Sequence, residues 1–144
     1  MGYKRKARIL FVSRRGAGAL IAQSFANTLG AARISARAGA CARPACLDLA
    51  REVVRELGFE AAAEEPLRMP DEGAIAWADL VVAMDRAAES VFAARLGGPP
   101  VKIFPLEEPA QAGEDRYRAL CSRIRARVEG MVGGMAMLEN QSEI

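Results

Sequence analysis

The sequence predicts an α/β domain with a four-stranded parallel sheet and helices on both faces. Short apolar runs alternate along the chain with longer segments in which apolar residues recur at helical spacing. Strands that are joined through helices run parallel, because a right-handed crossover returns the chain to the same end of the sheet. The 144 residues contain no long linker and no internal repeat, so residues 1–144 are expected to form one domain.

The first strand and helix follow one another closely. Ile9–Val12 is a short apolar run with β-branched and aromatic residues, which suits a strand buried on both faces. Gly16 and Gly18 come next, and the apolar residues after them fall at helical spacing as far as Gly30, where a helix can stop. Ala32–Gly39 is predicted to be the second strand.

The middle of the chain repeats this alternation. Leu47–Gly58 places its apolar residues on one helical face, and Met69–Ala78 opens with proline and acidic residues, as short helices do. The apolar run Asp79–Met84 predicts the third strand. Asp85–Gly98 predicts a helix that ends at glycines, and Val101–Phe104 predicts the fourth strand.

The last part of the chain is predicted to be a loop, Pro105–Gly113, followed by a long helix, Glu114–Val132. The remaining tail, residues 133–144, is expected to fray and to be flexible. Residues 1–6 are predicted to be a solvated basic flank ahead of the first strand.

Composition excludes several classes of function. The chain has no histidine, which excludes Ser-His-Asp and Cys-His catalysis and histidine-ligated metal sites. A net charge of +2 is too small to indicate nucleic-acid binding. No apolar run has membrane-spanning length, and the N-terminal stretch lacks a signal-peptide pattern, so we expect a soluble cytoplasmic protein with no membrane partner. We expect no metal and no cofactor.

The loop "SRRGAG" after the first strand is a candidate anion site. It lies at the carboxyl end of a parallel strand, where ligands bind in such sheets. Its glycines allow backbone N–H groups to turn inward, and the next helix adds its positive end. The alternative is a tight turn that needs glycine only for its backbone geometry. The candidate anion-binding residues are Ser13, Arg14, Arg15, Gly16, Ala17 and Gly18 of this loop, together with Arg37.

From about Ala7 to Val132 the chain resembles the low-molecular-weight protein tyrosine phosphatase family, which includes thiol-dependent arsenate reductases. The pieces that carry the resemblance occur in the family's order: "ILFVSRRGAGAL", "IAQSFANTLG", "RAGACARPACLDLAREVVRELGFE", "WADLVVAMDRA" and "EEPAQAGEDRYRALCSRIRARV". The resemblance implies a phosphatase-like fold with the four predicted strands in the order 2-1-3-4.

The resemblance also implies a catalytic loop of cysteine, five residues, arginine, and serine or threonine. Ser13 stands at the cysteine position, Ala19 at the arginine position and Leu20 at the hydroxyl position. A serine hydroxyl ionises far less readily than a thiol, and no histidine can take its proton. Loss of the arginine removes a bidentate clamp on the phosphoryl group. The sequence therefore predicts a catalytically degenerate member of the family.

The family's general acid is an aspartate before a proline, and here the pair is Glu108-Pro109. Glu108 could donate a proton, or it could be an exposed loop carboxylate beside Glu107, and we expect the second. Arg37 replaces the family's serine in its Ser-Ala-Gly segment.

Other side chains carry alternative roles. The three candidate arginines could supply the missing cation or could be solvated surface residues. Cys41 and Cys46 could form a redox pair or act as displaced nucleophiles, although two ordinary reduced thiols are expected. Cys121 and Trp77 are predicted to be core residues.

The function predicted from these observations is the binding of a phosphate-type anion or phosphorylated ligand, or of a protein partner, at the loop 13–20. Two alternatives stay open. One is an active phosphatase, a phosphoric monoester hydrolase, that uses Ser13 or a nearby cysteine with Glu108. The other is a protein similar to the phosphocysteine (IIB) subunit of a sugar phosphotransfer system, although that family is shorter and lacks the loop "EEPAQAG".

Overall fold

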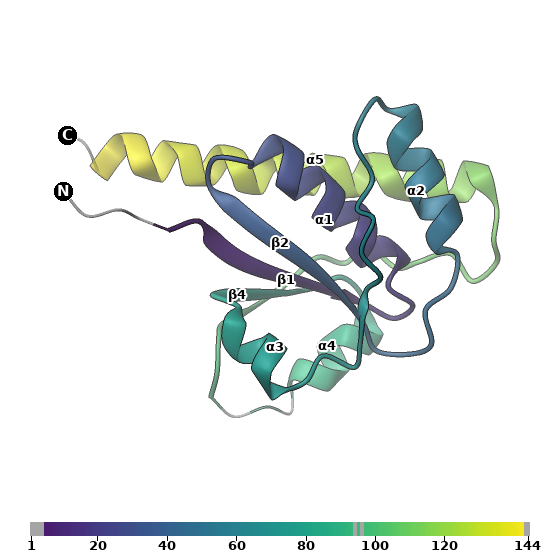
Figure 1. The fold of residues 1–144 in the computed structure, drawn as a ribbon, viewed down its shortest axis with the longest axis horizontal. Helices are drawn as coiled ribbons and strands as arrows, with labels where there is room; N and C mark the ends of the chain where they lie inside the picture. Colours follow the sequence, from purple (N-terminus) through teal and green to yellow (C-terminus); the bar gives the residue numbers. More distant parts are fainter. Residues whose placement is uncertain (1–4, 94, 96, 143–144) are drawn as a thin grey trace.

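Five parallel strands form the centre of the molecule (Figure 1). The computed structural model describes residues 5–93, 95 and 97–142, with side chains as far as residue 138. The strand order is β3-β2-β1-β4-β5, so the four predicted strands occur in the predicted order. The strands are β1 Ala7–Ser13, β2 Ile34–Ala40, β3 Leu67–Arg68, β4 Leu80–Ala83 and β5 Val101–Ile103.

The fifth strand corrects the predicted count of four. β3 has two residues, both exposed, and it pairs with Gly39 and Ala40 at the edge of the sheet. Two exposed residues make no apolar run, so the pattern that predicts buried strands cannot detect this one. Its backbone extends the sheet beside β2 and leaves the predicted order unchanged.

Helices cover both faces of the sheet, as predicted. Figure 1 shows α1, α2 and α5 on one side and α3 and α4 on the other. The larger core lies under the first group and includes Phe11, Phe25 and Tyr117, while a smaller core lies under α3 and α4. The helices are α1 Ala17–Leu29, α2 Leu47–Glu56, α3 Glu72–Trp77, α4 Arg86–Ala93 and α5 Glu114–Ser142.

Helix α5 is longer than the sequence pattern indicates. The prediction that residues 133–144 fray is wrong for residues 133–142, which continue the helix to Ser142, while residues 143–144 lie outside the described part. Two adjacent glycines, Gly133 and Gly134, favour a helix end. Met131, Val132 and Met135 nevertheless pack against the larger core, which favours continuation of the helix.

The N-terminal flank is described from Arg5 onward. Arg5 and Lys6 are exposed, as predicted for a solvated flank, but the Arg5 guanidinium also binds both oxygens of Asp79 at 2.6 and 2.7 Å. Residues 1–4 lie outside the described part. Among the described residues, no helix is long and apolar enough to cross a lipid bilayer.

The carboxyl ends of β1, β2 and β4 lie side by side at one end of the sheet. Ser13 ends β1 and lies opposite Ala40, the last residue of β2. Beyond the end of β4, the Met84 N–H donates to the Val12 carbonyl at 2.8 Å, which places Asp85 next to the loop after β1. Ligands bind at this carboxyl end of a parallel sheet.

Candidate functional site

The loop between β1 and α1 has a backbone that requires glycine at position 16. Gly16 has φ of 83°, in the left-handed region, and it precedes the first residue of α1. A Cβ at this position would lie 2.9 Å from two carbons of Pro66, so a side chain is excluded by space as well as by conformation. This turn points the N–H groups of the loop toward one place.

That place is occupied by the carboxylate of Glu108. The Arg15 N–H donates to Oε1 at 2.8 Å and the Gly18 N–H donates to Oε2 at 3.3 Å. The Ser13 hydroxyl also lies against this carboxylate and favours its ionised form, while the Ser13 Oγ accepts from the Ala19 N–H at 3.1 Å. The loop therefore holds an anion, and that anion belongs to its own chain.

The expectation that Glu108 is an exposed loop carboxylate is wrong. Its side chain is half-buried in the loop, 90 residues along the chain from Gly18. Burial raises the pKa of Glu108 above its usual value, and the nearby Asp85 acts in the same direction. The N–H groups of Arg15 and Gly18 oppose this by stabilising the ionised form.

The Asp85 side chain links the loop after β1 to the first turn of α4 through two hydrogen bonds. Its side chain is 1% exposed. One oxygen accepts from the Arg14 N–H at 2.7 Å and the other accepts from the Ala88 N–H, in the first turn of α4, at 3.0 Å. Glu107 accepts from the Arg86 N–H at 3.0 Å. Three carboxylates of the chain thus satisfy backbone donors at this edge of the sheet.

The three arginines of the predicted site do not converge. Arg14 and Arg15 contribute backbone N–H groups to the carboxylates, while the Arg14 side chain is exposed and that of Arg15 is half-buried. Arg37 lies elsewhere, with its guanidinium 4.4 Å from the ring centroid of Trp77. Trp77 packs partly buried against the smaller core, which agrees with its predicted role.

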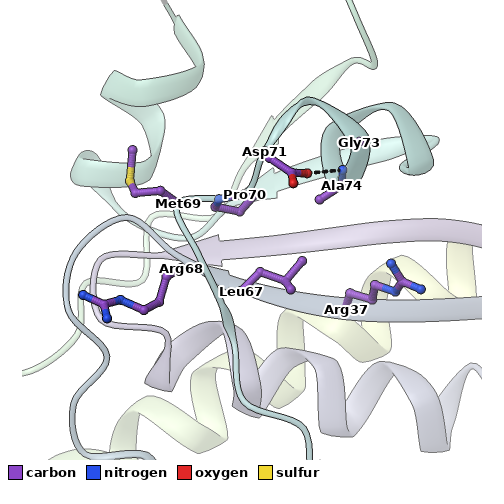
Figure 2. Close-up of a pocket in the computed structure, with 8 residues that line it drawn as sticks. All are labelled: Arg37, Leu67, Arg68, Met69, Pro70, Asp71, Gly73 and Ala74. Atoms are coloured by element: carbon purple, nitrogen blue, oxygen red, sulfur yellow. Dashed lines mark hydrogen bonds between the residues drawn. The ribbon is translucent and has the colours of Figure 1, made fainter.

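Arg37 also lines a cavity of about 320 Å³ beside the edge strand β3 (Figure 2). In Figure 2 the side chains of Arg37 and Arg68 lie at opposite ends of this cavity and extend away from each other. The cavity is separate from the loop 13–20, because none of its lining residues belongs to that loop. The lining residues are Arg37, Leu67, Arg68, Met69, Pro70, Asp71, Gly73 and Ala74.

The thiol of Cys41, near the loop, is unsuited to act as a thiolate. Cys41 follows β2, and its N–H donates to the Ser13 carbonyl at 3.0 Å. Burial, followed by the charges of Asp85 and Glu108, raises the pKa of the Cys41 thiol to about 11, so this thiol is protonated at neutral pH. Cys121 is buried in the larger core, as predicted.

Cys46 and Tyr117 meet on the α5 side of the loop. Cys46 is the residue before α2, with φ of 59°, and lies beside the Tyr117 hydroxyl. That hydroxyl is fully buried and has no partner with good hydrogen-bond geometry in the described part of the chain. Burial, and next the neighbouring Cys46, raises the pKa of Tyr117, so its proton stays in place.

The two other loop positions that the resemblance singles out are core positions. Ala19 and Leu20 are fully buried and belong to the larger core. Ala19 contributes only its N–H to the site, through the bond to Ser13. Among the described residues, no group of three histidine, cysteine, aspartate or glutamate side chains is placed to hold a metal ion.

The sequence reasoning missed two site residues, Asp85 and Glu107. Asp85 ends the segment "WADLVVAMD", which carries part of the family resemblance, but no role follows from the letters alone. Its position directly after a buried strand was the available signal, because such residues lie at the ligand-binding edge of a parallel sheet.

No protein-family model and no curated protein matches the sequence. Solved structures do match. An arginine phosphatase, YwlE, from Geobacillus stearothermophilus has a TM-score of 0.79 at 16% identity and covers 94% of this chain and 96% of its own. A low-molecular-weight protein tyrosine phosphatase from T. tengcongensis has a TM-score of 0.73 at 17% identity, over 90% and 99% of the two chains.

An arsenate reductase in its phosphate binding state has a TM-score of 0.68 at 19% identity, and it covers 89% of this chain and 98% of its own. Identities this low establish likeness of fold, while activity and ligand belong to each of those proteins separately. The chain has the α/β fold that low-molecular-weight phosphatases and arsenate reductases share.

Proposed function

We propose that this chain is a catalytically degenerate low-molecular-weight phosphatase-like protein that binds a phosphate-type anion at residues 13–20. The anion is either free or carried on a phosphorylated ligand such as a protein partner. The observation that carries the proposal is the convergence of two backbone N–H groups, from Arg15 and Gly18, on one carboxylate. A loop that holds a carboxylate in this way has the donor geometry for another oxyanion.

The degenerate chemistry rests on three positions. Ser13 replaces the attacking thiol, its hydroxyl is fully buried, and its oxygen accepts from the Ala19 N–H. Ala19 offers no guanidinium to the transition state. One positioned donor is worth about 10²–10³-fold in rate, so the loss of nucleophile and clamp together leaves little turnover. The nearby Cys41 is a poor replacement because its raised pKa keeps it protonated.

Calorimetric titration with inorganic phosphate tests the binding. A Cβ on Gly18 would lie 3.5 Å from Glu108 Cγ and 3.7 Å from Ser13 Cβ, which are ordinary contact distances. Gly18→Val therefore fills the mouth of the loop and should abolish binding. Gly130→Val makes the same change at an exposed position of α5 with no atom near the added Cβ, and should bind like the wild type. Absence of heat, and of any thermal protection by phosphate, would refute the proposal.

A second function, slow hydrolysis of a phosphate ester, is favoured by one contact. The Ser13 hydroxyl and the Glu108 carboxylate lie together, as a nucleophile and a base would. An aryl phosphate assayed at several pH values distinguishes the two functions. The binding proposal predicts no sustained turnover. Sustained turnover that Ser13→Ala abolishes would replace that proposal with an active hydrolase.

A further inference from the structure

The carboxylate of Glu108 uses the donors that an incoming anion needs. Its two oxygens accept from the N–H groups of Arg15 and Gly18, and its position beside Ser13 puts it at the centre of the loop. Two anions cannot share these donors, because both the space and the N–H groups are taken and their charges repel. We propose that Glu108 is an intramolecular competitor that a phosphate-type anion must displace, so the loop 13–20 is self-inhibited until Glu108 leaves.

This inference rests on the proposed function and adds its regulation. The segment that carries Glu108 is attached to the rest of the molecule in a way that permits release. Before it, the Leu106 N–H donates to the Met84 carbonyl at 2.9 Å and the Leu106 side chain is buried. After it, the Gly113 carbonyl accepts from the Tyr117 N–H at 3.0 Å.

Between these two anchors, the described hydrogen bonds of residues 107–112 are those of two side chains. Glu107 binds the Arg86 N–H, and Glu108 binds the loop. The segment belongs to no strand or helix. Outward movement of Glu108 therefore breaks no bond of the sheet or of α5, and its main cost is the two N–H bonds that an incoming anion replaces. We call residues 107–112 the latch.

The surroundings of Glu108 favour its protonated form in the closed latch, so protonation makes the latch harder to open. Asp85 from the end of β4 lies near it with like charge, and Arg15 from the loop contributes its backbone N–H. The Cys41 thiol after β2 and the Tyr117 hydroxyl of α5 complete the surroundings, and both are protonated at neutral pH.

Burial raises the pKa of Glu108, so on acidification it takes up a proton at a higher pH than an ordinary glutamate. Once the side chain leaves the loop, its pKa returns toward the ordinary value, so an anion that displaces Glu108 also releases a proton at low pH. Anion affinity should therefore decrease as the pH falls through the pKa of Glu108. The chain has no histidine whose titration would obscure this change.

The experiment titrates the full chain with sulfate, whose charge stays constant over the working range, at neutral and at mildly acidic pH. Glu108→Gln keeps the shape of the side chain but replaces one of the two accepting oxygens with an NH2 group, which cannot accept from the Arg15 or Gly18 N–H. Glu52→Gln makes the same change at an exposed residue of α2, outside both the loop and the latch. If the closed latch outweighs the open one about tenfold, Glu108→Gln should bind sulfate about tenfold more tightly than the wild type at neutral pH.

Wild type and Glu52→Gln should bind alike and more weakly on acidification, while Glu108→Gln should show a much smaller pH dependence. Equal affinity of wild type and Glu108→Gln at both pH values would overturn the latch and leave the proposed function intact. No sulfate binding by any variant would overturn both. The amide NMR signals of Arg15 and Gly18 separate these failures: in the wild type they should titrate with Glu108, and sulfate should shift them.

Discussion

Replacement of Asp85 by alanine tests whether the edge of the sheet is organised by carboxylates that bind backbone N–H groups. Asp85 is 1% exposed, and its two oxygens accept from the N–H groups of Arg14 and Ala88 at 2.7 and 3.0 Å. The substitution leaves the Arg14 N–H without its acceptor and removes the side chain that caps α4. The Arg14 and Ala88 N–H groups are partly or fully buried, so water does not readily replace the lost acceptor.

The magnitude follows from these two bonds. A hydrogen bond to a charged group contributes about 1.5–3 kcal/mol to stability. Loss of a helix cap costs about 0.5–2 kcal/mol. Asp85 also repels Glu108, and removal of this repulsion offsets part of the lost free energy of unfolding. We therefore expect Asp85→Ala to lower the free energy of unfolding by about 2–4 kcal/mol.

Urea unfolding followed by circular dichroism measures this loss. Asp71→Ala is the matched control, because Asp71 also caps a helix, accepting from the Ala74 N–H at 2.8 Å, but is exposed and touches no loop donor. The control should lose about 1 kcal/mol. If Asp85→Ala is no more destabilising than Asp71→Ala, then the bond from Asp85 to the loop contributes nothing and the reasoning fails.

Three further predictions concern packing and ionisation around the site. Gly39→Ala would place a Cβ 2.5 Å from Pro70 Cγ, so the strand and the following turn must separate; we expect a loss of about 1–3 kcal/mol in urea unfolding, and an unchanged midpoint would contradict this. Cys41 has a pKa of about 11, so its alkylation by iodoacetamide should be slow at neutral pH and should accelerate up to about that pH; a rate equal to that of a small free thiol at neutral pH would refute the burial argument. Tyr117→Phe removes a buried hydroxyl that lacks a well-formed hydrogen bond, so the thermal midpoint should stay the same or increase, and a clear decrease would show that the hydroxyl is bonded.

The sequence by itself determined the central architecture. The strand that ends at Ser13 and the helix that follows are encoded locally, by an apolar run and then by apolar residues at helical spacing. The same patterns predicted three other strands, β2, β4 and β5, and the packing of helices on both faces. Such features follow from nearby residues, because burial of one face requires a regular period that can be read along the chain.

Only the tertiary structure decided what fills the loop. The partner of the Gly18 N–H is Glu108, 90 residues away. The Glu108-Pro109 pair singled out this glutamate through the family resemblance, but the sequence predicted an exposed carboxylate that does not reach the loop. The edge strand at Leu67–Arg68 and the helical continuation past Gly133 depend in the same way on neighbours distant in sequence. Hydrogen bonds and packing between distant segments are properties of the folded arrangement, because the chain must first bring the partners together before either interaction contributes energy.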